Sequence, residues 1–126
     1  MTIRRVMKSD LIVATPQMPL KQAVQLLIDH RISGMPVVDD DRHIVGVISE
    51  MDLIATLGEP HRTFRTVADV MTSNPVSIGV DEDLVRVYDV LMTHTFRRVL
   101  IHDGNKLVGL VSRADLIPII LEGLGD

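Results

Sequence analysis

Two serine–aspartate pairs are the residues of this sequence best suited to chemistry. Ser49 precedes Asp52 by three positions and Ser112 precedes Asp115 by three, each after an apolar run and before a helical pattern. This spacing is close to a capping box, in which the hydroxyl and the carboxylate satisfy free backbone N–H groups. It also suits a nucleotide, because helix N-terminal N–H groups attract phosphate and a carboxylate accepts hydrogen bonds from a ribose diol. One copy alone favours capping, whereas repetition of the whole block strengthens the ligand interpretation.

The sequence around these pairs is duplicated. Residues 45–54, Val-Gly-Val-Ile-Ser-Glu-Met-Asp-Leu-Ile, recur as residues 108–117, Val-Gly-Leu-Val-Ser-Arg-Ala-Asp-Leu-Ile. The alignment extends back to Val6–Ser9 and Val70–Ser73 with one residue lost in the turn after Asp39. Self-similarity at half the chain length indicates two copies of one structural unit.

Hydrophobic periodicity predicts the elements that position these pairs. Apolar residues spaced i, i+3, i+4, i+7, i+8 over 20–28 and again over 84–92 predict two helices, each with a single apolar face. The first is expected to end near residues 29–31. Short Val- and Ile-rich runs predict strands at 12–14, 35–38 and 44–48, and at 76–78, 99–102 and 107–111. A helix follows each serine, and Pro118 is expected to kink or end the second one.

Each half therefore reads β-α-β-β-α after a short leading turn. A unit of this size makes a marginal core by itself, so the halves are expected to depend on each other. We predict an α/β (α+β) fold in which two repeats, residues 1–60 and 61–126, pack sheet to sheet with pseudo-twofold symmetry.

Composition argues against several classes of function. The net charge is −4 and aromatic residues are 2%, so a nucleic-acid partner, which calls for a basic face and stacking rings, is not expected. No apolar run approaches the ~20 residues that a membrane helix needs. The absence of cysteine excludes disulfides and thiol catalysis, and with no signal-like N-terminus it makes the cytoplasm the expected location.

The sequence gives little support for catalysis. The histidines at positions 30, 43, 61, 94 and 102 lack the spacing of a helical metal pair, so neither a metal nor a resident cofactor is expected. Ser49 and Ser112 lack the Gly-x-Ser-x-Gly nucleophile elbow. The chain is therefore expected not to be an enzyme.

The repeated strand, Gly-x-x-Ser-x-x-Asp and helix resemble the cystathionine β-synthase (CBS) domain, present here as a tandem pair. The resemblance covers residues 3–121 and includes the Gly34–Asp39 segment, Gly-Met-Pro-Val-Val-Asp. It implies a pair of repeats with clefts between them that bind AMP, ADP, ATP or S-adenosylmethionine, that regulate rather than catalyse, and that commonly dimerise.

Carried over residue by residue, the resemblance implies two ligand sites. Asp52 and Asp115 match the family aspartate that holds the ribose diol, and Ser49 and Ser112 match the residue near ribose or phosphate. The implied adenine sandwich uses the strands with Ile12, Val13, Met35 and Pro36 in the first half and with Val76, Ser77 and Val99 in the second. Arg98 matches a basic residue that reaches phosphate.

The two halves differ in charge. The second has Arg97, Arg98 and Arg113, whereas the first has Ser33, Gly34 and Glu50 at the equivalent positions. By charge the site around Ser112 and Asp115 is the better phosphate site, although it lacks the proline that the first half has as Pro36. The other site is expected to prefer a less charged ligand or to stay empty.

We therefore expect a regulatory module that binds an adenine-containing ligand, forms a homodimer and signals to an unidentified regulated protein. The alternative is a ligand-free module for dimerisation and interaction. Response to a panel of adenine ligands separates the two hypotheses.

Overall fold

The computed structural model describes residues 2–93 and 98–125, and the chain divides into two compact units. We call residues 12–75 the Asp52 unit, and residues 1–11 with 76–126 the Asp115 unit. The units are not simple halves of the sequence, because the first eleven residues belong to the unit that contains the second repeat.

The Asp52 unit holds one three-stranded sheet. Its elements are α2 (Leu20–His30), β1 (Gly34–Val38), β2 (Ile44–Ser49), α3 (Glu50–Ala55), the 3₁₀ turns η1 (Thr56–Gly58) and η2 (Val67–Asp69), and β3 (Thr72–Ser73). The order β1-β2-β3 is antiparallel throughout. The strands and helices expected after residue 20 are thus present, and Ser49 caps α3 as predicted.

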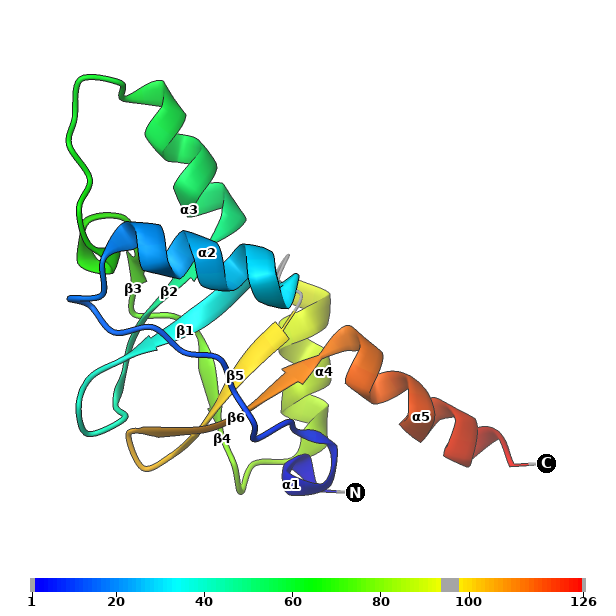
Figure 1. The fold of residues 1–126 in the computed structure, drawn as a ribbon. Coiled ribbons are helices and arrows are strands. Elements are labelled where there is room, and N and C mark those ends of the chain that lie inside the picture. The colour runs from blue at the N-terminus through cyan, green and yellow to red at the C-terminus, as the bar shows by residue number, and fades with distance from the viewer. Residues whose placement is uncertain (1, 94–97, 126) are drawn as a thin grey trace. The chain divides into compact units, whose positions relative to one another are not determined.

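The Asp115 unit holds the second three-stranded sheet. Its elements are α1 (Ile3–Val6), β4 (Ser77–Gly79), α4 (Leu84–Thr93), β5 (Arg98–Asp103), β6 (Lys106–Ser112) and α5 (Arg113–Leu124), as labelled in Figure 1. β4 runs parallel to β5, and β5 runs antiparallel to β6. The mixed α/β fold class predicted from the sequence is therefore confirmed.

A short leader segment closes one edge of each sheet. Residues 67–72 place β3 beside β2, with Thr72 opposite Val47. In the same way residues 3–8 place Lys8 beside Leu110 of β6, with both backbone hydrogen bonds made at 2.8 and 2.9 Å. Each leader thus packs on the sheet of the other repeat, which the sequence pattern did not reveal.

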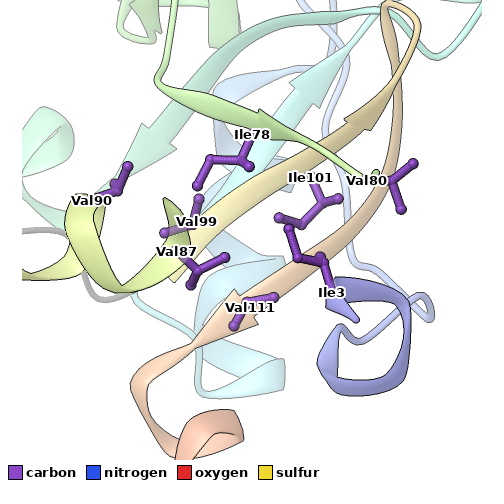
Figure 2. Packing of buried hydrophobic residues seen from close by; sticks show 8 residues of the cluster. All are labelled: Ile3, Ile78, Val80, Val87, Val90, Val99, Ile101 and Val111. Carbon is purple, nitrogen blue, oxygen red and sulfur yellow. The ribbon is translucent and has the colours of Figure 1, made fainter. Parts of the chain in front are cut away.

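Buried apolar residues form a separate core in each unit. In the Asp115 unit, Ile3 of α1 and Val87 of α4 pack with strand residues of the sheet, as Figure 2 shows for Ile78, Ile101 and Val111. In the Asp52 unit the core joins Ala23 and Leu27 of α2 to Met35, Val37 and Ile48 of the strands and to Val67 of the leader.

The predicted helix faces need correction at their outer edges. Ala23 and Leu27 are buried as expected, but Ile28 is 64% exposed. In α4 the expected face included Tyr88 and Met92, yet these are 56% and 68% exposed, while Val90 is buried instead. The buried stripes are therefore narrower than the i, i+3, i+4 pattern implied.

Two local expectations also differ from the structure. The predicted strand at 12–14 contributes only a single parallel bridge between Ala14 and Val37. Pro118 does not end the last helix, because α5 continues through it to Leu124. Proline removes the hydrogen bond to the carbonyl of Ala114, but both residues are exposed, so water can take that carbonyl. None of the helices in residues 2–93 and 98–125 combines the length and apolar character of a membrane span.

The repeated glycine explains how each leader fits against its sheet. A Cβ placed on Gly46 would lie 2.8 Å from the carbonyl oxygen of Thr72 and 2.9 Å from Sδ of Met71. A Cβ on Gly109 would lie 2.9 Å from Cγ of Met7. At Gly46 the backbone of Thr72 and the side chain of Met71 occupy the space of a side chain, and at Gly109 the side chain of Met7 occupies it.

Gly46→Ala is therefore expected to lower the free energy of unfolding by about 1–3 kcal/mol, since the added methyl group meets backbone. Urea denaturation measures the change. Gly123→Ala in α5 is the matched control, because nothing lies within 4 Å of its added Cβ and alanine favours a helix. An equal effect of both substitutions would contradict this role for Gly46.

Candidate functional site

Each serine–aspartate pair lies where a strand runs into a helix and forms a capping box. Asp52 Oδ2 accepts hydrogen bonds from the backbone N–H of Ser49 at 2.9 Å and from its hydroxyl at 3.0 Å. Asp115 Oδ2 accepts the same two bonds from Ser112, at 2.8 and 2.9 Å. The capping interpretation is thus confirmed at both junctions, and it uses one oxygen of each carboxylate.

The second oxygen of each carboxylate faces the leader segment. Thr72 donates its hydroxyl to Asp52 Oδ1 at 2.8 Å. Lys8, which aligns with Thr72 in the repeat, places Nζ 3.6 Å from Asp115 Oδ1. We call these Oδ1 atoms the outer oxygens. A neutral donor contacts the outer oxygen in one unit, and a cation contacts it in the other. Neither leader residue was predicted to belong to the site, although the repeat alignment places Lys8 and Thr72 at equivalent positions.

Strand register gathers the other predicted residues at one end of each sheet. Arg98 lies directly opposite Ser112, as Gly34 lies opposite Ser49. Because β4 is parallel to β5, β4 starts on the same side of the sheet as Arg98. Its first residue, Ser77, lies opposite Leu100, two residues further along β5 than Arg98, and Val76 directly precedes it. Ser77 therefore lies nearer the middle of the sheet than Ser112 does.

The charged members of the predicted site stand at the same junction. Arg113 is the first residue of α5 and is exposed, and Glu50 is its exposed counterpart at the start of α3. Arg98 is half-buried at the start of β5. Arg97 lies outside the described residues, so the structure does not place it.

The apolar members of the predicted site are mostly core residues. Val99 is 1% exposed and Met35 is 2% exposed, and both belong to the hydrophobic cores. Pro36 is also buried. These three side chains are therefore closed to a ligand and leave only their backbone to line a site. Ile12 and Val13 are half-buried, and Val76 is 40% exposed.

Ser77 has a partner that the sequence did not indicate. Its hydroxyl lies 2.8 Å from Nδ1 of His102, on the neighbouring strand. This contact holds the hydroxyl toward the far end of the sheet. There an open depression of about 360 Å³ is lined by residues 79–82 and 102–104, none of which was predicted. Its wall includes Glu82, whose pKa is lowered by a hydrogen bond from the backbone N–H of Gly79.

The turn between β1 and β2 also brings polar atoms together. Ligand-type atoms of Asp39, Asp41 and His43 lie within 4.8 Å of one another. Asp39 Oδ1 accepts the backbone N–H groups of Asp41 and His43, each at 2.9 Å, and Oδ2 lies 3.2 Å from the His43 ring. These bonds account for the cluster as the closure of a tight turn.

The capping boxes give a stability prediction. Ser112→Ala removes the hydroxyl from the box and is expected to lower the free energy of unfolding by about 1 kcal/mol. Chemical denaturation measures it, with Ser9→Ala at an exposed leader position as the control. A loss no larger than that of the control would show that the box does not stabilise α5.

Comparison with known proteins gives a consistent result. The CBS domain family model matches residues 3–59 and 67–122. CBSX1, a chloroplastic CBS domain-containing protein of Arabidopsis thaliana, is 28% identical to this chain, and the alignment covers 91% of the chain and 61% of CBSX1. The chain thus spans about three fifths of the length of that relative.

Solved structures show the same arrangement of elements. The crystal structure of CBSX2 in complex with AMP has a TM-score of 0.86 at 28% identity, covering 98% of each chain. The CBS domain pair of protein MJ0100, in complex with 5-methylthioadenosine and S-adenosyl-L-methionine, has a TM-score of 0.80 at 23% identity. The second likeness concerns the fold alone.

Proposed function

Because this chain belongs to the CBS domain family and carries the repeat twice, we propose that it is a regulatory module that binds an adenine-containing ligand. The observation that carries the proposal is the outward oxygen of Asp115. Its partner oxygen is fixed by Ser112, so Oδ1 is left for other donors, and Nζ of Lys8 lies 3.6 Å from it. The AMP complex of CBSX2 supports an adenine nucleotide as the ligand class.

The groups around Asp115 match the parts of such a ligand. A carboxylate oxygen accepts hydrogen bonds from both hydroxyls of a ribose diol. The first N–H groups of the twelve-residue helix α5 favour a phosphate, because they lack partners within the helix and carry its positive dipole end. Arg98 and Arg113 add positive charge at the same junction.

The Asp52 unit has the equivalent carboxylate but lacks the long helix and the arginines at that junction. Its helix α3 has only six residues, and Glu50 opens it where the other unit has an arginine. A phosphate is disfavoured beside Glu50, because like charges repel, whereas Arg113 takes the equivalent position in the other unit. We therefore propose the Asp115 site as the nucleotide site and assign the Asp52 site a less charged ligand.

Regulation follows from differential affinity. A ligand shifts a conformational equilibrium only by the difference in its affinity for the two states. We propose that ligand occupancy at the sheet ends is what a regulated protein detects. The function needs binding and release only, so no catalytic group is assigned.

Isothermal titration calorimetry with AMP, ATP and S-adenosylmethionine tests the site. Asp115→Asn keeps an oxygen for Ser112 but replaces an acceptor with a donor, so it is expected to weaken nucleotide binding at least tenfold, about 1.4 kcal/mol. Asp89→Ala, at an exposed position of α4, is the control. Unchanged affinity in Asp115→Asn would remove Asp115 from the site.

A second candidate function rests on an apolar stripe. Helix α5 has no buried residue in the structure, and four of its side chains are more than half exposed: Ile117, Ile120, Leu121 and Leu124. Their i, i+3, i+4, i+7 spacing makes one seam, and such a seam is complementary to a second copy of itself about a two-fold axis. We propose that the chain forms a homodimer through α5, either with the ligand function or as a ligand-free interaction module.

Leu121→Glu is expected to convert the dimer to monomer, because it places a charge in the middle of the seam. Light scattering coupled to size-exclusion chromatography measures the mass. Glu122→Lys, beside the stripe, should leave the dimer intact. A monomeric wild-type chain, or a dimer unaffected by Leu121→Glu, would exclude this interface.

A thermal shift with adenine ligands separates the ligand-binding module from the ligand-free module, since ligand at 100 times its dissociation constant adds about 2.7 kcal/mol to the free energy of unfolding.

A further inference from the structure

Lys8 and Thr72 are equivalent residues that give the two carboxylates different neighbours. Both follow the leader methionine, Met7 or Met71, and both contact the Oδ1 atom that the capping box leaves available. The contact is a hydroxyl hydrogen bond of 2.8 Å at Asp52 and an ammonium group 3.6 Å away at Asp115. The repeat therefore preserves the position and changes the charge.

Backbone pairing fixes each leader residue, so only its side chain varies. Lys8 and Leu110 exchange both backbone hydrogen bonds, and Thr72 of β3 is paired with Val47 of β2. The residue before each one is held as well, because Met7 packs against Gly109 and Met71 packs against Gly46. A side chain that leaves this position is aimed at the outer carboxylate oxygen in both units.

Lys8 can leave Asp115 and contact a bound ligand instead. The Lys8 side chain is 71% exposed, whereas that of Asp115 is only 10% exposed. An exposed ion pair of this kind is weak, and an ammonium on a flexible four-carbon stem has three donors that it can redirect without moving its backbone. When ribose hydroxyls occupy Oδ1, the ammonium can turn to an anionic part of the same ligand.

We propose that Lys8 is a specificity-determining residue of the Asp115 site, which selects adenine ligands that carry phosphate. The inference rests on the proposed function and extends it from a ligand class to a choice within that class. Thr72 supplies no charge at the equivalent place, and Glu50, two positions before Asp52, is negative. The Asp52 site is therefore left without this selection.

The test compares AMP with adenosine, which differ only by the phosphate, in calorimetric titrations of the full chain. In Lys8→Thr, which installs the residue of the other leader, AMP affinity is expected to fall roughly tenfold, because a charge-assisted contact is lost. Adenosine affinity should change less than about twofold, because the ribose contact to Asp115 remains. Lys8→Arg should retain the preference for AMP.

Lys106→Thr is the matched control, because Lys106 begins β6 and lies at the end opposite Ser112. Equal losses for AMP and adenosine in Lys8→Thr would assign Lys8 a structural role and overturn the selectivity. No loss for either ligand would overturn it as well. If the wild-type chain bound neither AMP nor adenosine, the proposed function itself would fail, an outcome distinct from the other two.

Discussion

The structure depends on one carboxylate in each unit that serves two partners. Through Oδ2 the aspartate ties the end of a strand to the start of a helix, with bonds to Ser49 in one unit and Ser112 in the other. Through Oδ1 it reaches the leader segment that lies along the same strand. Strand, helix and leader therefore converge on a single acidic group. Any ligand that donates hydrogen bonds to that group acts on all three elements at once.

This convergence explains why the leaders matter beyond packing. The glycine of each repeated block admits a methionine of the leader against the strand backbone, and the next residue then faces the carboxylate. In the Asp52 unit Asp69 anchors the leader further. Its carboxylate accepts hydrogen bonds from the backbone N–H groups of Thr66 and Arg65, which lower its pKa, the one from Thr66 most. The two sites thus share a scaffold and differ in the few side chains that carry charge.

Much of this fold could be predicted because duplication and periodicity are local properties of the sequence. The helices after residues 20 and 84, the strands around 35–48 and 99–111, and the boxes at Ser49 and Ser112 all have local signals. The leaders were missed as site elements because their partners, Leu110 for Lys8 and Val47 for Thr72, lie far away in sequence. The Val- and Ile-rich strands were expected to be buried, and Met35 to fill the core, as they are. That Val99 and Met35 are thereby closed to a ligand could not be predicted, since a continuous apolar run does not show which face of a strand is covered. Likewise His102 gave no sign that it would take the hydroxyl of Ser77.

In the proposed complex, Oδ1 of Asp115 receives the sugar of an adenine nucleotide. The most direct measurement is a crystal structure of the chain grown with AMP. Ribose hydroxyls are expected within hydrogen-bond distance of Asp115 Oδ1, with Oδ2 still held by Ser112. AMP bound elsewhere, with Asp115 Oδ1 still contacted by Lys8 alone, would contradict it.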